Sequence, residues 1–231
     1  MIKAIITDIE GTTSSLSFVK DSLFPYARAH VAEFIHENAA NEIVQALLAD
    51  VNAEVSAELD LEQAITQLIQ WMDDDKKITP LKSLQGLIWE SGYKRGELTG
   101  HLYPDVIRNL QTWKAEGFDL YIYSSGSVYA QKLLFAHTEA GDLTPLFSGY
   151  FDTHIGNKQD SNSYENIVAH IGLPAEQLVF LSDIEAELNA AQTAGLQTIW
   201  LIREEDAPQT EATHQQVKDF DAIELERFVY E

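Results

Sequence analysis

The sequence contains no cysteine, and its 231 residues include only 15 lysines and arginines against 37 aspartates and glutamates. The absence of cysteine excludes disulfide bonds and thiol chemistry. The formal charge of -22 argues against nucleic acid or an anionic membrane as a partner, because both are bound through basic patches. No signal-peptide pattern opens the sequence, and its first apolar run is far too short to span a bilayer. We therefore expect a soluble, cytoplasmic protein.

The rest of the composition is ordinary for a globular protein, with 45% hydrophobic and 23% charged residues. A chain of this length can form one large core, or a core and a smaller second domain. Because the overall charge would repel an anionic substrate, such a substrate would need local positive charge from a metal ion or a few placed lysines. Nothing in the sequence demands a partner chain, so we expect a monomer.

The first fifteen residues combine a short apolar run with two carboxylates. The β-branched run at residues 2–6 predicts a buried strand, and Asp8, Glu10 and Gly11 follow it. If the extended backbone persists past Asp8, its side chain and that of Glu10 point the same way. Two converging carboxylates are costly unless a hard cation lies between them or one of them is protonated. An acidic turn after an edge strand is the competing explanation of so short a motif.

Residues 16 to about 100 show helical periodicity and no convincing strand. Apolar residues recur at helical spacing from Val31, from Asn41 and from Leu61, and Asp60 is placed to cap the last of these helices. Thr79-Pro80 predicts the start of a further helix, with proline at its first position. This block is expected to form a separate small helical domain.

Two features of that last predicted helix and of the residues after it bear on function. Trp89 and Tyr93 fall on one face, where they can pack the small domain or belong to a lid over an active site. The glycines at 92, 96 and 100, with the basic residues at 94 and 95 between them, predict a hinge-like connector rather than the interior of an element.

Helices alternate with strands from residue 103 onward. The predicted strands are residues 118–123, 149–155, 178–181 and 197–202, and residues 220–225 are expected to be a last strand or a helix cap. Strands separated by helices of this length indicate βαβ units, so the predicted fold class is α/β with a doubly wound parallel sheet. Residues 1–15 and 104–231 would form this core, and residues 16–103 the smaller α-helical domain inserted after the first strand.

Polar residues follow the predicted strands, at the edge of the sheet where the carboxyl ends of parallel strands meet. They are Asp8 and Glu10, then Ser124 and Ser125, then Lys158, then Asp183. A carboxylate can attack phosphorus to form an acyl phosphate, while hydroxyl groups and a lysine hold the phosphoryl oxygens. Mg²⁺ prefers oxygen ligands and usually takes one or two carboxylates, a requirement that Asp8 and Asp183 meet. Each piece alone has an ordinary explanation, such as helix capping, but their joint placement favours a phosphoryl-transfer site.

This order of residues resembles the haloacid-dehalogenase superfamily of aspartyl phosphatases. The four motifs of the superfamily correspond to Asp8-Ile9-Glu10-Gly11-Thr12, Ser124, Lys158, and Asp183 with Glu187. The resemblance covers the whole chain and implies that the inserted helical domain is a cap. Phosphatases of the superfamily usually carry aspartate two residues after the nucleophile, whereas this chain carries Glu10.

Four segments further resemble the enolase-phosphatase family of methionine salvage. They are residues 8–14, 78–86 with Trp89, 121–127 and 151–158. The resemblance implies that the substrate is 2,3-diketo-5-methylthiopentyl-1-phosphate, which is enolised and then dephosphorylated to the acireductone 1,2-dihydroxy-3-keto-5-methylthiopentene. It also implies one Mg²⁺ per subunit.

The same resemblance implies roles for the catalytic residues. Asp8 would be the nucleophile and a metal ligand. Glu10 would offer its backbone carbonyl to Mg²⁺ and act as general acid, then as general base. Lys158 would bind the phosphate and Asp8.

The remaining matched positions would bind rather than react. Ser124 and Ser125 would contact the phosphate or the neighbouring keto oxygens. Asp183 would hold the metal directly or through water, and Glu187 would orient Lys158 or the water shell of the metal.

The sequence leaves several alternatives open. The base for enolisation is not assigned: Glu10 ranks first because its position is fixed, and Lys82 or Tyr93 are alternatives. A receiver-type signalling module shares the sheet, the acidic residues and the lysine, but its phosphoacceptor lies on a middle strand and it has no cap. A scaffold with this fold would be expected to have lost Asp8 or Lys158. Among enzymes, the alternative is a generalist phosphatase acting on sugar or nucleotide phosphates.

Overall fold

The computed structural model describes residues 1–203 and 213–225, which fall into two compact units. The first unit contains Met1–Leu16 and the chain from Gly100 onward, and the second is Ser17–Thr99. Within the described ranges, no helix is long and apolar enough to cross a membrane.

The first unit is built on a parallel sheet in the order β3-β2-β1-β4-β5-β6. Its strands are β1 (Ala4–Thr7), β2 (Asp119–Tyr123), β3 (Phe147–Phe151), β4 (Leu178–Ser182), β5 (Gln197–Leu201) and β6 (Gln215–Val217). The two central strands, β1 and β4, are buried over their whole length. Both are apolar up to their last residue, because helices cover both faces of a doubly wound sheet. The predicted α/β fold class is confirmed.

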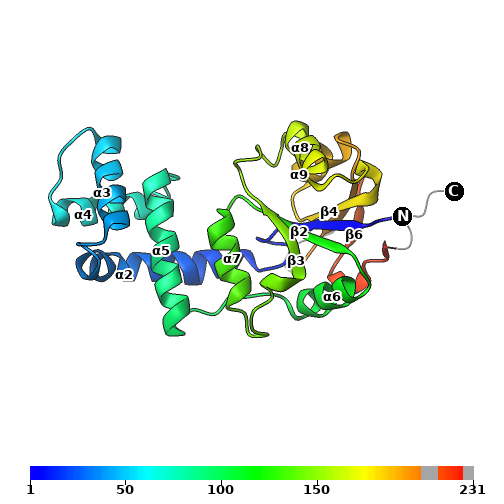
Figure 1. Ribbon diagram of the computed structural model, residues 1–231, viewed down its shortest axis with the longest axis horizontal. Coiled ribbons are helices and arrows are strands. Elements are labelled where there is room, and N and C mark those ends of the chain that lie inside the picture. The colour runs from blue at the N-terminus through cyan, green and yellow to red at the C-terminus, as the bar shows by residue number, and fades with distance from the viewer. Residues whose placement is uncertain (204–212, 226–231) are drawn as a thin grey trace. The chain divides into compact units, whose positions relative to one another are not determined.

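Helices connect the strands of this unit. They are α6 (Pro104–Ala115), α7 (Val128–Ala136), α8 (Ser161–Ile171) and α9 (Glu185–Thr193), with short 3₁₀ turns at Thr144–Leu146, Ala175–Gln177 and Phe220–Ala222. Figure 1 shows α8 and α9 on one side of the strands and α6 on the other. The strand order reverses at β1, which leads away to β2 and β3 on one side and adjoins β4 and β5 on the other. The carboxyl end of β1 therefore lies at a topological switch point, where open α/β sheets bind ligands.

Two predicted boundaries of the sheet differ from the structure. The third strand is Phe147–Phe151 rather than residues 149–155, because Asp152 accepts the backbone N–H of His154 and turns the chain. Residues 220–225 form no strand; a 3₁₀ turn covers Phe220–Ala222 instead. The sixth strand, Gln215–Val217, lacks the apolar pattern that the prediction relies on.

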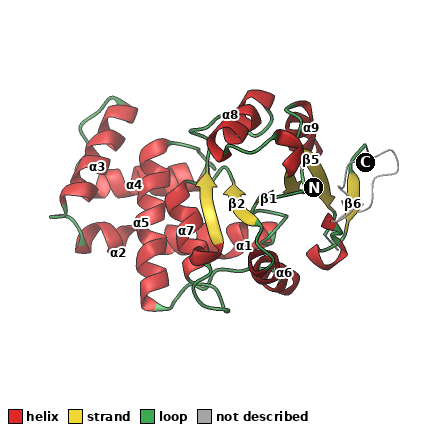
Figure 2. Cartoon of the chain, turned by 45° about the vertical axis from the view of Figure 1, so that its right-hand side comes forward, coloured by secondary structure: helices red, strands yellow, loops and turns green. Residues whose placement is uncertain are grey.

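The second unit contains helices and no strand in the described chain (Figure 2). α1 (Leu16–Phe18) leads through a π-helical turn (Val19–Leu23) into α2 (Phe24–Glu37), which is followed by α3 (Glu42–Val55), α4 (Leu61–Asp73) and α5 (Thr79–Arg95). Its core is aliphatic and aromatic, with Leu68 and Leu84 fully buried. At the start of α4, Asp60 and Gln63 form a reciprocal capping box, which satisfies two otherwise unpaired N–H groups.

The predicted connector at the glycines is wrong in its first half. Gly92 and the two basic residues after it lie inside α5, and Gly96 caps its C-terminus in the left-handed conformation at φ 72°. Gly92 is required for packing, because a Cβ there would lie 2.7 Å from the ring of Tyr26 on α2. Its role is close approach of two helices rather than flexibility.

Candidate active site

The loop after β1 is a tight turn organised by one carbonyl. The Ile9 carbonyl oxygen accepts the backbone N–H groups of residues 12–14, at 3.2, 2.9 and 2.9 Å. The Asp8 carboxylate accepts the N–H of Ile9 at 2.7 Å. The strand ends at Thr7, so the extended backbone does not persist to Glu10, and the argument that alternation aligns Asp8 with Glu10 fails.

Lys158 lies between two carboxylates. Its Nζ is 2.7 Å from Oδ1 of Asp8 and 2.7 Å from Oε2 of Glu187, and the three side chains are only 7–10% exposed. Burial by itself would lower the pKa of the Lys158 ammonium, but Asp8 and Glu187 outweigh it and hold that pKa above its usual value. The ammonium is thus charged and fixed beside the carboxylate predicted to be the nucleophile.

The loop that carries Lys158 is clamped by α8. The Tyr164 hydroxyl donates to the Lys158 carbonyl at 2.7 Å, and the Ser163 hydroxyl donates to the Asn157 carbonyl at 2.7 Å. Gly156 has φ +141°, and a Cβ there would lie 2.1 Å from Oγ of Ser163. Glycine is therefore needed to bring this loop against the helix.

Asp183 follows β4 and faces the turn after β1. Its Oδ1 accepts the Thr12 hydroxyl at 3.2 Å, and its carbonyl accepts the indole N–H of Trp200 at 2.9 Å. Burial first, and then the negative charge of Asp8, raise the pKa of Asp183 to about 7. The Asp183 carboxylate is thus held in a place where ionisation is unfavourable without added positive charge.

The charges of this cluster do not balance. Two carboxylates, those of Asp8 and Glu187, contact the Lys158 ammonium, and a third, that of Asp183, is close enough for the charges of Asp8 and Lys158 to shift its pKa. Burial and the nearby Asp8 also raise the pKa of Glu187, against the opposing effect of Lys158. A site of this kind favours a cation.

The residues present fit Mg²⁺. In the described parts of the chain, no three His, Cys, Asp or Glu side chains gather as a metal-binding group, but Mg²⁺ needs only one or two carboxylates beside water. Asp8 and Asp183 could supply these, whereas Oε2 of Glu187 already bonds to Lys158 and to the Ser182 hydroxyl. Gly11, at φ +78°, lets the Asp183 carboxylate lie directly against the turn after β1, since a Cβ there would lie 2.2 Å from its Oδ2.

The serines predicted to bind phosphate follow β2. Ser124 is buried and its hydroxyl oxygen accepts the N–H of Gly126 at 3.2 Å, while Ser125 is exposed. The buried Asp152 fixes the next helix by accepting the first N–H of α7, from Val128, at 3.0 Å. β2 is the immediate neighbour of β1, so this loop adjoins the carboxyl end of β1, which Asp8 directly follows.

The three candidates for the enolisation base differ in their surroundings. Glu10 is half-buried in the same turn as Asp8. Lys82 is exposed on α5 and Tyr93 is buried on the same helix. Burial raises the pKa of the Tyr93 phenol far above its ordinary value, which makes a phenolate base unfavourable.

Three residues near the site, Arg203, Asp105 and Trp200, were not predicted from the sequence. Arg203 lies two residues past β5, and its guanidinium donates to the Thr12 carbonyl and to the Asp105 carboxylate. The available signal was its place: a basic residue just after a predicted strand, at the sheet edge that carries the other candidates, in a chain with few basic residues. Trp200 gave no such signal, because a tryptophan in a buried strand is ordinarily explained by packing.

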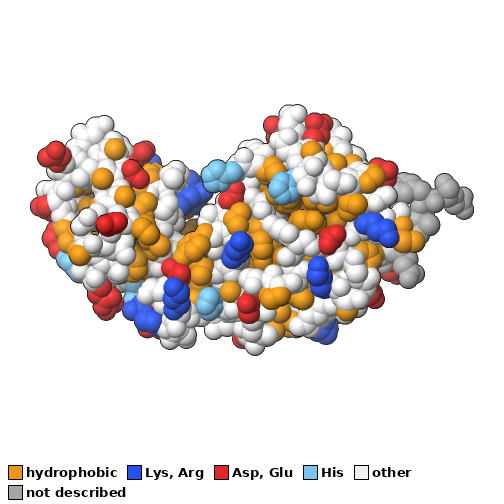
Figure 3. Space-filling view, viewed as in Figure 1, with side chains coloured by type: hydrophobic (Ala, Val, Ile, Leu, Met, Phe, Trp, Pro, Cys, Tyr) orange, Lys and Arg blue, Asp and Glu red, His pale blue; other side chains and the backbone are white. Residues whose placement is uncertain are grey.

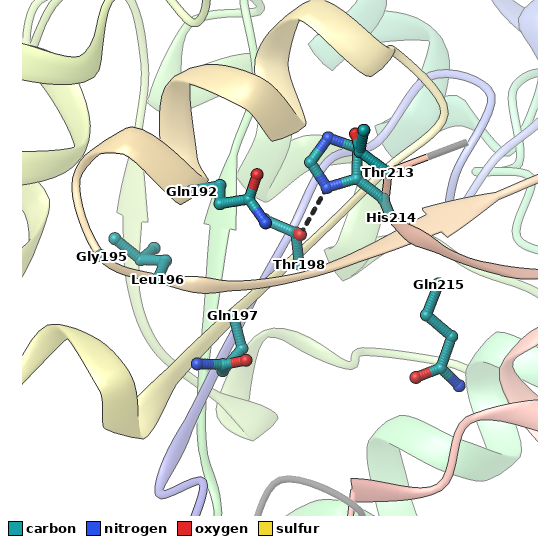
Figure 4. Close-up of a pocket in the computed structure, with 8 residues that line it drawn as sticks. All are labelled: Gln192, Gly195, Leu196, Gln197, Thr198, Thr213, His214 and Gln215. Carbon is teal, nitrogen blue, oxygen red and sulfur yellow. Dashed lines mark hydrogen bonds between the residues drawn. The ribbon is translucent and has the colours of Figure 1, made fainter. Parts of the chain in front are cut away.

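A separate pocket lies at the amino ends of β5 and β6, whereas Asp8 and Asp183 follow the carboxyl ends of β1 and β4. It measures about 340 Å³ and is lined by Gln192, Gly195, Leu196, Gln197, Thr198, Thr213, His214 and Gln215. Within it, Nδ1 of His214 lies 2.7 Å from the Thr198 hydroxyl, and its Nε2 lies 3.0 Å from Oδ1 of Asn189 (Figure 4). Both ring nitrogens are therefore engaged, which is typical of a structural histidine.

Comparison with known proteins identifies relatives along the whole chain. A model of the haloacid dehalogenase-like hydrolase family matches residues 2–195. A protein of Methylococcus capsulatus named enolase-phosphatase E1 is 56% identical over 227 residues, which are 98% of this chain and 99% of that one. A protein of the same name from Yersinia enterocolitica is 52% identical over 229 residues, 99% of each chain.

Solved structures share the fold. The crystal structure of the UTR4 protein from Saccharomyces cerevisiae superposes with a TM-score of 0.84 at 33% identity, over 96% of this chain and 100% of that one. CbbY from Rhodobacter sphaeroides, in complex with phosphate, gives a TM-score of 0.59 at 16% identity over 96% of each chain, which is a likeness of fold alone.

Proposed function

Because the chain belongs to the haloacid dehalogenase-like hydrolase family and to its enolase-phosphatase branch, we propose that Asp8 attacks a substrate phosphate as the nucleophile. The chain is an enzyme of the phosphatase class. The observation that carries the assignment of Asp8 is its contact with Lys158, at 2.7 Å, at the switch point of the sheet. The Asp8 carboxylate can attack phosphorus, and the buried Lys158 ammonium beside it can offset the negative charge of the phosphoryl oxygens.

Hydrolysis of the phosphate ester proceeds in two steps, formation and hydrolysis of an aspartyl phosphate. An Asp8 carboxylate oxygen forms a bond to phosphorus as the ester P–O bond breaks, and Glu10 gives the departing oxygen a proton. Water then attacks phosphorus of the aspartyl phosphate, Glu10 takes a proton from that water, and the Asp8 carboxylate and inorganic phosphate are released. Glu10 is thus protonated before and after these two steps, and it must release that proton to solvent before it can act as the base in the next enolisation.

Binding of the phosphate falls to the residues around Asp8. The Lys158 ammonium offsets the charge of the phosphoryl oxygens, and Glu187 and Asp8 hold it in place from either side. The Ser124 and Ser125 hydroxyls donate to the phosphate or to the keto oxygens beside it.

The carboxylates of Asp8 and Asp183 and the backbone carbonyl of Glu10 would hold one Mg²⁺. When bound, Mg²⁺ would offset the charge between carboxylates and phosphate and acidify the C–H next to a coordinated carbonyl. Two features support this: the unfavourable ionisation of Asp183, and the absence of a side chain at Gly11, which lets the Asp183 carboxylate lie against the turn that carries Asp8 and Glu10.

The substrate that we propose is 2,3-diketo-5-methylthiopentyl-1-phosphate, enolised and then hydrolysed to the acireductone of methionine salvage. Glu10 is the preferred base for enolisation, because it shares the turn of Asp8 and because the raised pKa of Tyr93 disfavours that alternative. Lys82 stays the second candidate. We also propose that the chain works as a monomer.

The test is an assay of the purified protein with Mg²⁺ on the diketo phosphate and on a panel of sugar and nucleotide monophosphates. A transient enol absorbance that precedes phosphate release is expected on the diketo phosphate. Equal turnover across the panel without that absorbance would favour a generalist phosphatase. Undiminished turnover in the presence of a chelator would remove the proposed role of Mg²⁺.

A further inference from the structure

Arg203 is a buried cation that contacts the backbone of the turn after β1. Its side chain is 9% exposed, and both Nε and Nη2 donate to the carbonyl oxygen of Thr12, Nε at 3.1 Å. Nη1 donates to Oδ2 of Asp105 at 2.9 Å. The guanidinium carbon also lies 4.1 Å from the ring centre of Tyr103. The planar group is therefore fixed by a carbonyl, a carboxylate and an aromatic face at once.

Thr12 connects this cation to the active site. Its carbonyl receives two of the N–H donors of Arg203, while its hydroxyl donates to Oδ1 of Asp183 at 3.2 Å. One residue thus joins the guanidinium on one side to a proposed metal-binding carboxylate on the other. A shift of the Thr12 backbone would move the hydroxyl that supports Asp183.

The distribution of donors argues that Arg203 does more than neutralise Asp105. Asp105 receives one N–H of the guanidinium and also accepts the backbone N–H of Phe220 at 2.8 Å. The other two bonded N–H groups converge on a single neutral carbonyl in the catalytic turn. A lysine would keep the charge but cannot supply this fork of donors.

We propose that Arg203 is a positioning residue that holds Thr12, and through it the Asp183 carboxylate, in the geometry needed to bind the divalent cation. The inference rests on the proposed metal-dependent phosphatase function, and it assigns Arg203 no contact with substrate or metal. Residues that orient metal ligands commonly alter metal affinity by 10–100-fold when replaced. Because Arg203 acts through Thr12, the effect of its loss belongs at the lower end of that range.

The test compares Arg203→Lys, Thr12→Val and the double variant with the wild type. Mn²⁺ binding is titrated by electron paramagnetic resonance, and the Mg²⁺ concentration for half-maximal phosphate release is measured in parallel. Each single variant should weaken Mn²⁺ binding about tenfold and raise the Mg²⁺ requirement equally. The double variant should bind Mn²⁺ as tightly as each single variant, because both changes break the same connection from Arg203 through Thr12 to Asp183. At saturating Mg²⁺, the KM for substrate should stay near the wild-type value.

Asp105→Asn is the matched control, since it weakens the ion pair while its side-chain oxygen still accepts the Phe220 N–H. It should lower the melting temperature without changing Mn²⁺ affinity by more than about twofold. If Arg203→Lys lowers the melting temperature but binds Mn²⁺ like the wild type, or if the two single effects add fully, Arg203 is only a structural clamp. A wild-type protein that neither binds Mn²⁺ nor releases phosphate would instead contradict the proposed function itself.

Discussion

The two units of the chain look alike on the face that Figure 3 shows, but their interiors differ. On the face shown in Figure 3, acidic, basic and apolar side chains are mixed over both units. Inside, the contrast is sharp: of the described polar and charged residues that are buried, Gln85 alone lies in Ser17–Thr99, and the others lie in the first unit. Buried charges are costly, so a unit that keeps Asp8, Lys158 and Glu187 below 10% exposure does so for a reason other than stability.

This difference separates two ways in which the units should respond to substitution. In the first unit, replacing a buried charge should change chemistry, and in one case it should improve the stability of the metal-free protein. In the second unit, the core is a packed helical assembly, so truncation should cost stability without changing the chemical groups at the site.

The largest effect is expected from Asp8→Asn. The amide keeps the shape of the side chain but is a poor nucleophile, so phosphate release should fall by at least about 10⁴-fold. Release is measured on the diketo phosphate, with far-ultraviolet circular dichroism to check the fold. Substantial residual turnover by a folded variant would remove Asp8 from the role of nucleophile.

Lys158→Met should come next, because it leaves the Asp8 and Glu187 carboxylates buried without their shared ammonium. Breaking a buried pair in this way costs about 3–5 kcal/mol, and activity should be lost as well. Lys218→Met is the matched control in the same unit: its side chain is 79% exposed, and the expected change is within about 1 kcal/mol. Urea denaturation gives both values, and equal losses in the two variants would contradict the account.

Leu68→Ala probes the second unit, where this side chain is fully buried. The cavity should cost about 2–5 kcal/mol of unfolding free energy. Mn²⁺ affinity at a temperature where the variant is folded should equal that of the wild type. A change in metal affinity comparable to that of Thr12→Val would erase the distinction between the units.

The smallest of the four effects is the pH dependence set by Asp183. Its folded-state pKa of about 7 lies above the ordinary value of 3.8, so its favourable contribution is complete below that ordinary value and is lost as pH rises through 7. Without metal, the stability of Asp183→Asn relative to the wild type should rise by about 1 kcal/mol between pH 5 and pH 8. This is about half of the linkage value for that pH range, because the carboxyl group keeps some contact with solvent.

The measurement for Asp183 is urea denaturation with a chelator at both pH values, followed by addition of Mg²⁺. Mg²⁺ should stabilise the wild type at pH 8 and leave Asp183→Asn unchanged. If the difference in unfolding free energy between the two proteins does not vary with pH, ionisation of Asp183 does not destabilise the fold.

The sheet and the polar residues at its carboxyl edge could be predicted because both follow from short, contiguous stretches of sequence. Buried strands such as β4 are continuous apolar runs, and the parallel arrangement then brings Asp8 and Asp183 to one edge whatever the details of the loops. The direction of the Glu10 side chain could not be obtained in this way. It depends on the turn around the Ile9 carbonyl, which begins directly after the strand has ended at Thr7.

Long-range packing accounts for what the sequence did not reveal. Gly92 resembles a hinge until Tyr26, 66 residues earlier in the chain, is seen to occupy the space of its missing side chain. Likewise, Arg203 and Thr12 are 191 residues apart, and no local sequence pattern predicts the hydrogen bond between them.

The most direct test of the central claim is to search for the phosphorylated protein. Wild-type enzyme is mixed with the diketo phosphate and Mg²⁺, quenched in acid during turnover, and its peptides are analysed by mass spectrometry. The account predicts one phosphoryl group, on the peptide that contains Asp8, and none when Asp8→Asn is treated in the same way. Phosphate release accompanied by a phosphoryl group on another residue would contradict it.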